Sequence, residues 1–171
     1  VTPYDVLLLA TGSNAFMPPI QGLDKDGVFA FRTLDDTRAL LERSAPGRKA
    51  IVIGGGLLAL EAAPGLQVQG CDVTVVHLMS TLMERQLDPD GGQYLLGKME
   101  DLGVTVLLGR TTTAILGNGH VEGVALSDDS VLEADLVVVA AGIRPNVDLA
   151  VKAGLAVNRG VLVNDYMETS S

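Results

Sequence analysis

The sequence predicts an α/β fold, a Rossmann-like parallel sheet with helices and a three-stranded antiparallel meander. Three observations predict it. Short apolar runs alternate with helix-forming segments, a glycine run at 54–56 directly follows one apolar run, and turn-forming residues interrupt the stretch 111–132. Strands that alternate with helices are typical of a parallel sheet, whereas short strands separated by tight turns indicate hairpins.

The apolar runs and turn residues set the expected order of elements. The predicted strands are residues 6–10, 50–53, 72–77, 104–108, 111–116, 120–126, 131–132, 134–141 and 161–163. The predicted helices are residues 34–43, 57–69 and 89–102. Thr33 and Asp88 are good N-caps for the first and third helices. Pro64 lies inside the second helix, where it removes one hydrogen bond and is expected to kink the chain.

Composition excludes several functional classes. The 171 residues carry a formal net charge of −9, which repels phosphate backbones and makes nucleic acid an unfavourable partner. One cysteine and two histidines predict neither an internal disulfide nor a metal site. No apolar run approaches the length of a membrane span, and no signal peptide is visible. We therefore expect a cytoplasmic protein, and both ends read as cuts in a larger chain.

The glycine run carries the main chemical signal. Gly54 permits a tight turn out of the strand, Gly56 lets the backbone approach a pyrophosphate, and Ala59 allows close packing between helix and strand. The helix that begins at Leu57 directs free N–H groups at the anion. The sequence thus predicts a site for the pyrophosphate of NAD(P)H. The alternative is a glycine turn that serves packing alone.

Two nearby residues leave alternatives open. His77 stands 23 residues after Gly54, where an acid that binds the ribose 2′-hydroxyl of NAD is expected. A neutral imidazole suits a hydroxyl and a protonated one suits a 2′-phosphate, so the choice between NADH and NADPH stays open; His77 is alternatively a strand-end residue that only tolerates the cofactor. Glu61 on the helix either bonds the nicotinamide carboxamide or is an ordinary surface glutamate.

Three segments together resemble the pyridine-nucleotide flavoprotein reductase family, whose members pass a hydride from NAD(P)H to FAD. They are Ala10-Thr11-Gly12, the stretch 54–61, and residues 141–146. The resemblance implies an NAD(P)H-binding domain at 22–144, with residues 1–21 and 145–171 as arms of a FAD domain of the same polypeptide. Because both FAD motifs of the family lie outside this sequence, the chain by itself is not expected to hold FAD well.

The resemblance also implies site residues, and it implies neither a catalytic side chain nor a metal ligand. The implied cofactor-binding positions are Gly54, Gly56, Leu57, Leu58, Glu61, His77, Gly142 and Ile143. In this scheme the first four meet the phosphates and Glu61 approaches the nicotinamide. His77 faces the adenosine ribose, and the last two lie beside the nicotinamide near the flavin.

Within that family, the run at 82–88 is similar to the branch of assimilatory NAD(P)H-dependent nitrite reductases, specifically their large subunits. This implies that the full-length protein adds FAD, an iron–sulfur cluster and sirohaem, and reduces nitrite to ammonia. The rival within the family is a rubredoxin- or ferredoxin-type reductase, or an NADH oxidase. A different class is a non-catalytic NAD(H) sensor, and a homodimer is a further option that the sequence leaves open.

Overall fold

The computed structural model describes residues 2–170, which divide into two compact units. The larger is Ala15–Gly142, and the smaller combines the residues up to Asn14 with those from Ile143 onward. The predicted NAD(P)H-binding domain, 22–144, begins seven residues after the start of the larger unit and ends two residues beyond its end. That the flanking segments belong to a FAD domain stays a prediction.

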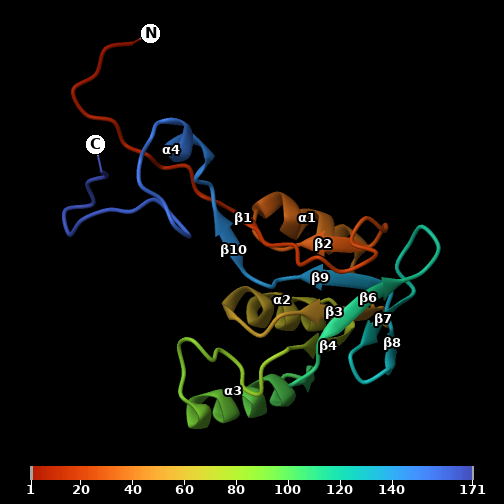
Figure 1. Ribbon diagram of the computed structural model, residues 1–171. Helices are drawn as coiled ribbons and strands as arrows, with labels where there is room; N and C mark the ends of the chain where they lie inside the picture. The colour runs from red at the N-terminus through yellow and green to blue at the C-terminus, as the bar shows by residue number, and fades with distance from the viewer. Residues whose placement is uncertain (1, 171) are drawn as a thin grey trace. The chain divides into compact units, whose positions relative to one another are not determined.

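A five-stranded parallel sheet forms the centre of the larger unit (Figure 1). Its strands, in spatial order, are β2 (Val28–Ala30), β9 (Leu136–Val139), β3 (Lys49–Ile53), β4 (Asp72–Val76) and β5 (Thr105–Leu107). The predicted strands at 50–53, 72–77, 104–108 and 134–141 are confirmed. The edge strand β2 was not predicted, because three half-buried residues give too short an apolar signal.

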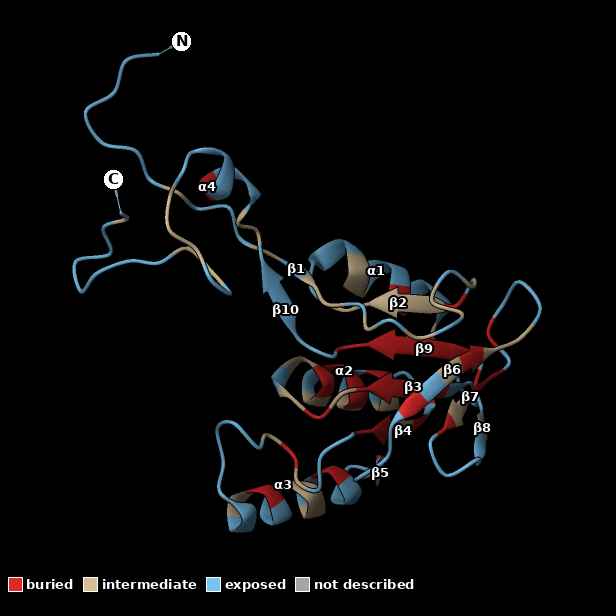
Figure 2. Cartoon of the chain, in the orientation of Figure 1, coloured by how far each residue is buried: buried red, intermediate tan, exposed pale blue. Residues whose placement is uncertain are grey.

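Both faces of the sheet are covered, which explains the continuous apolar runs at 50–53 in β3 and 136–139 in β9. Along β3, Ala50 and Val52 join one buried cluster, whereas Ile51 and Ile53 join another on the opposite face. Figure 2 shows β3, β4 and β9 as the buried centre of the sheet. Strands buried on both faces read as unbroken apolar runs rather than as alternating ones.

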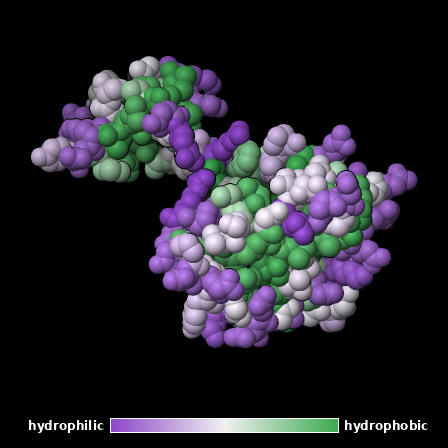
Figure 3. Space-filling model, turned by 60° about the horizontal axis from the view of Figure 1, so that its bottom comes forward, coloured by the Kyte–Doolittle hydropathy of each residue, from purple (hydrophilic) through white to green (hydrophobic). Residues whose placement is uncertain are grey.

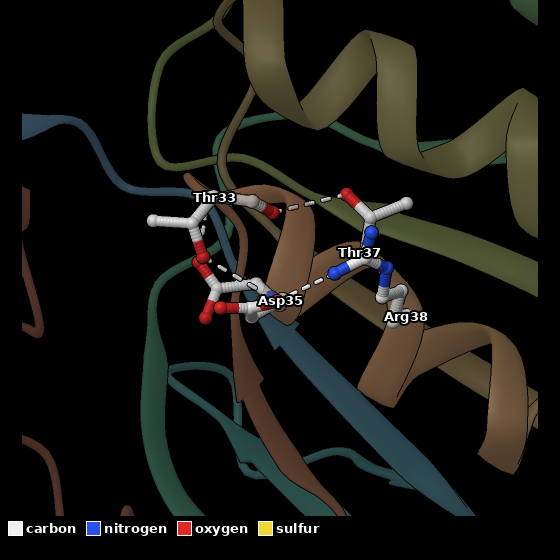
Figure 4. A network of polar contacts seen from close by, with 5 residues as sticks. Thr33, Asp35, Thr37 and Arg38 are labelled. Atoms are coloured by element: carbon white, nitrogen blue, oxygen red, sulfur yellow. Dashed lines mark hydrogen bonds and ion pairs between the residues drawn. The ribbon is translucent and has the colours of Figure 1, made fainter.

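Three helices pack on the sheet face that carries Ala50 and Val52 and contribute to the buried cluster there. Two of these helices are capped as predicted. The helix α1 (Leu34–Arg43) begins after Thr33, whose Oγ1 accepts from the Asp36 N–H at 3.2 Å, while Asp36 Oδ2 accepts from the Thr33 N–H at 2.7 Å. Figure 4 shows Thr33 in this N-terminal turn. The helix α3 (Pro89–Asp101) begins after Asp88, whose Oδ1 accepts from the Gly91 N–H at 2.8 Å.

The helix α2 (Leu57–Val68) packs on the sheet through small residues and remains helical past Pro64. Ala59, Ala62 and Ala63 are at most 3% exposed, so the helix axis lies close to the strands. Pro64 lacks the N–H that would donate within the helix, and its ring crowds the preceding turn. Tertiary burial therefore holds this helix together despite an unfavourable residue.

The predicted meander is confirmed and covers the second cluster. It consists of β6 (Thr112–Leu116), β7 (Gly123–Leu126) and β8 (Val131–Glu133), all antiparallel. Gly117 opens the first hairpin at a φ of +130°, and a Cβ there would lie 2.0 Å from the His120 carbonyl oxygen. Only glycine is compatible with this turn.

In the smaller unit, two strand predictions were wrong. Residues 6–10 form no strand, and Val6 and Leu8 are 88% and 84% exposed. A strand needs a neighbour for its N–H and C=O groups, and no described residue supplies one here. Residues 161–163 contribute only a single bridge, between Val157 and Val161.

Three short elements at the borders of the units were not predicted. β1 (Ser13–Ala15) and β10 (Ile143–Pro145) form a two-stranded sheet, and α4 (Asp148–Lys152) follows. Pairing between segments so far apart in the chain leaves no periodic signal in either short stretch. In addition, no helix among residues 2–170 is long and apolar enough to cross a membrane.

We expect Pro64→Ala to stabilise the larger unit. Alanine restores the missing hydrogen bond of α2, and proline in a helix interior costs up to about 3 kcal/mol relative to alanine. The expected gain in the free energy of unfolding is about 1–3 kcal/mol. Urea unfolding followed by far-UV circular dichroism measures it, and an unchanged or lowered midpoint would contradict the role assigned to this residue.

Candidate nucleotide-binding site

The glycine loop connects the carboxyl end of β3 to the start of α2, and it lies between the two neighbouring strands. The Gly54 N–H donates to the Val76 carbonyl at the end of β4 at 2.9 Å. On the other side, a Cβ at Gly54 would lie 2.4 Å from the Ala140 carbonyl oxygen, directly after β9. With a φ of +133° as well, the position admits only glycine.

Glycine is present at the next two positions, Gly55 and Gly56, for different physical reasons. A Cβ at Gly55 would lie 2.4 Å from carbon atoms of the His77 ring, so the absence of a side chain lets the imidazole pack against this residue. A Cβ at Gly56 would meet no atom within 4 Å. The missing side chain at Gly56 therefore leaves open space beside the loop rather than room for another part of the protein.

The helix that follows begins without a side-chain cap, unlike α1 and α3. Gly56 is its N-cap and offers no side-chain acceptor, and the first turn contains no acidic residue. The first N–H groups of a helix have no partner within the helix, and they carry the positive end of its dipole. An anion bound against the Gly56 backbone would satisfy both.

His77 lies directly after β4, as predicted, but its ring nitrogens face inward. The residue is 6% exposed, and its Nε2 lies 3.2 Å from Glu84 Oε2. Its Nδ1 is fully buried and has no hydrogen-bond partner among the described residues. In this arrangement the group beside His77 that reaches the surface is Glu84, whose side chain is 28% exposed.

Glu84 belongs to the segment between β4 and α3, which is fixed onto the glycine loop. The Met83 N–H donates to the Gly55 carbonyl at 3.0 Å, and Met83 adopts a left-handed φ of +52°. The neighbouring Leu82 is fully buried in the first cluster. Sequence reasoning missed Glu84, because a contact across seven residues of irregular loop has no periodicity to reveal it.

The remaining predicted positions lie on two segments, the helix α2 and residues 142–143. Leu57 and Leu58 form the first turn of α2, and Glu61 is exposed on the same helix. Gly142 ends the larger unit with a φ of +114°, and a Cβ there would meet no atom within 4 Å. Ile143 belongs to the smaller unit and is 45% exposed. The structure thus brings together the glycine loop, the start of α2 and His77.

A hollow elsewhere on the larger unit is lined by Lys49, Glu133 and Asp135, at the amino ends of β3 and β9. The hydrogen bond between Lys49 and Glu133 raises the pKa of the ammonium and lowers the pKa of the carboxyl. Parallel sheets of this kind bind ligands at the carboxyl ends of their strands, where the glycine loop lies. Among the described residues, no group of three or more His, Cys, Asp or Glu side chains is arranged to hold a metal ion.

Curated proteins similar to this chain are redox enzymes or their subunits. Nitrite reductase (NAD(P)H) of Bacillus subtilis (strain 168) is 53% identical over 169 residues, which are 99% of this chain and 21% of that protein. The assimilatory nitrate reductase electron transfer subunit of the same organism is 48% identical over 98% of this chain and 22% of its own length. NADH oxidase of Methanocaldococcus jannaschii is 41% identical over 98% of this chain and 38% of its length. The chain thus spans between a fifth and two fifths of these relatives.

Solved structures with the same fold belong to similar enzymes. The covalent putidaredoxin reductase–putidaredoxin complex matches with a TM-score of 0.92 and 29% identity, over 98% of this chain and 42% of that one. Water-forming NADH oxidase from Lactobacillus brevis, bound to NADH, gives a TM-score of 0.84 and 28% identity over 93% of this chain and 35% of its own. An engineered water-forming NADPH oxidase bound to NADPH gives a TM-score of 0.87 and 28% identity, over 99% of this chain and 38% of its own.

A family model agrees with the fold and the glycine loop. The model described as pyridine nucleotide-disulphide oxidoreductase matches residues 1–171, the whole of the sequence. The chain belongs to the pyridine nucleotide-disulphide oxidoreductase family.

Proposed function

We propose that this chain is the NAD(P)H-binding domain of a flavoprotein oxidoreductase and that it positions the nicotinamide for hydride transfer to FAD. The observation that carries the proposal is the open space beside Gly56, at the uncapped start of α2 and the carboxyl end of β3. When bound, the nicotinamide supplies the hydride and the flavin accepts it, while the protein supplies position and electrostatics.

The residues around the glycine loop fit a pyrophosphate. Gly54 and Gly56 keep side chains away from the anion, and the first turn of α2 at Leu57 and Leu58 presents N–H groups to it. No acidic side chain in that turn opposes the charge. A net charge of −9 for the chain does not prevent this binding, because helix-terminus groups act over a few ångströms and distant charges are screened.

Three further positions are proposed for the nicotinamide end. Glu61 is exposed on α2, and its carboxylate is able to accept a hydrogen bond from the carboxamide. Gly142 has no neighbouring atom where its side chain would be, which leaves space for a ring to approach. Ile143 follows it directly and offers an exposed apolar side chain.

We further propose that the full-length protein is a nitrite reductase that contains FAD, an iron–sulfur cluster and sirohaem. The 53% identity to a nitrite reductase and the similar run at 82–88 support this acceptor. The 41% identity to an NADH oxidase supports the rival, in which the same domain serves a different acceptor. The visible spectrum of the full-length protein separates the two: sirohaem bands support nitrite reduction, and a spectrum of flavin alone contradicts it.

The smaller unit supports the assignment of this domain to a longer flavoprotein. Figure 3 shows that apolar side chains reach the surface of the molecule. In the smaller unit, Val6, Leu8, Tyr166 and Met167 are each at least 78% exposed. Exposed apolar side chains mark a contact surface where they form a contiguous patch, and we propose that these residues belong to such a patch and that a FAD domain of the same polypeptide covers it.

We expect Gly56→Ala to weaken nucleotide binding without unfolding the protein. The added methyl group meets no protein atom but fills the space assigned to the pyrophosphate. The expected loss is at least about tenfold in affinity for NADH, or about 1.4 kcal/mol. Titration calorimetry measures the affinity, and thermal unfolding checks that the fold is kept.

The matched control is Gly65→Ala, on the same helix. A Cβ at Gly65 also meets no atom within 4 Å, but this residue lies more than two turns away from the loop. Alanine there should stabilise the helix by about 0.5–1 kcal/mol and leave NADH affinity unchanged. Equal nucleotide affinity in the Gly56→Ala variant and the wild type would count against a pyrophosphate at this loop.

We expect the 171-residue chain to purify without flavin while still binding NADH or NADPH weakly. Its glycine loop is complete, whereas the family's FAD motifs lie outside this sequence. An absorption spectrum of the purified chain tests the first half, and nucleotide fluorescence tests the second. A stoichiometric yellow flavin in the preparation would overturn the expectation.

A further inference from the structure

We propose that Glu84, held in place by His77, binds the adenosine ribose of the nicotinamide nucleotide and makes the site selective for NADH over NADPH. The proposal rests on the proposed function and names a specificity residue for it. In Rossmann-type sites an acid at the end of the second strand of the motif bonds the ribose 2′-hydroxyl. Here His77 occupies that strand end, after β4, and Glu84 is its hydrogen-bonded neighbour.

His77 itself is poorly placed to bond a hydroxyl. Its ring packs against Gly55, its Nε2 is bonded to Glu84, and its Nδ1 is fully buried. Since the carboxylate of Glu84 only accepts hydrogen bonds, Nε2 carries the proton and donates it. His77 is therefore a positioning residue, because Nε2 is already bonded to Glu84 and Nδ1 is buried.

Glu84 supplies the acceptor that the strand end lacks. Its side chain is 28% exposed, so it reaches the surface beside the glycine loop. Only Oε2 is used by His77, and no described residue bonds Oε1. A carboxylate oxygen with free lone pairs at this place is suited to the 2′-hydroxyl of a ribose.

The backbone that leads to this carboxylate is anchored to the rest of the larger unit. Leu82, two residues earlier, is fully buried, and the Met83 N–H is bonded to the Gly55 carbonyl. The same loop that would receive the pyrophosphate therefore also holds the segment that carries Glu84. Because this backbone is already anchored, less conformational entropy is lost on binding.

Selectivity follows from the charge of Glu84. A 2′-phosphate would bring up to two negative charges beside the carboxylate, and like charges in a partly buried site repel strongly. The backbone N–H of Arg110 donates to the His77 carbonyl, but the guanidinium of Arg110 is paired with the Asp128 carboxylate at 2.8 Å. Arg85, the next residue after Glu84, is exposed and has no ion pair within the described residues, so it is tested as a competing cation.

The experiment compares NADH and NADPH by titration calorimetry on the 171-residue chain, for the wild type and Glu84→Gln. The wild type should bind NADH at least about tenfold tighter than NADPH. The glutamine keeps an oxygen for the His77 N–H but loses the charge, so the preference for NADH should fall by about tenfold or more. A merely structural role would weaken both nucleotides equally and leave their ratio unchanged, which would overturn the proposal.

Two controls separate the different ways in which the proposal can fail. Glu42→Gln removes the same charge from an exposed position on α1 and should leave the ratio unchanged. Arg85→Ala should leave NADH affinity unchanged; a selective loss of NADPH affinity together with a wild-type preference for NADPH would assign the site to Arg85 instead. If the wild type binds neither nucleotide, the proposed function fails; if it binds both with one affinity, only the selectivity fails.

Discussion

The contact that the rest of the site depends on is the insertion of Gly54 between the ends of two strands. Its N–H is bonded to β4, and a Cβ at this position would lie 2.4 Å from the Ala140 carbonyl oxygen, directly after β9. This contact turns the chain sharply at the carboxyl edge of the sheet. It thereby fixes where α2 begins and the direction in which its first N–H groups point.

The buried small residues of α2 hold the whole helix in the position that Gly54 sets for its start. Ala59, Ala62 and Ala63 keep the helix against the sheet, so its amino end stays at the strand edge. The helix does so despite Pro64 and without a capping side chain, features that would destabilise it in isolation. The missing cap is explained if an anionic ligand takes its place, which links a local weakness of the fold to the proposed function.

How far the sequence predicted the structure depends on the range of the interactions involved. The helix α1 and its cap follow from neighbours in the chain, and the strands β3 and β4 follow from runs of mostly apolar, β-branched residues. The glycine loop was predictable for the same reason, because strand, turn and helix are consecutive. The strand prediction for residues 6–10 was wrong because an apolar run becomes a strand only beside a partner strand. The contact between His77 and Glu84 was invisible because it depends on how an irregular loop folds back onto Gly55.

Amide correlation NMR spectra of the chain, recorded while NADH is added, show which edge of the sheet binds the nucleotide. We expect the largest chemical-shift changes at the amides of the glycine loop and the first turn of α2, from Gly54 to Leu58. The chemical shifts of amides around Lys49 and Glu133, at the opposite edge of the sheet, should stay unchanged. Shift changes centred on that opposite edge, with the signals of the glycine loop unchanged, would show that the nucleotide does not bind at the glycine loop.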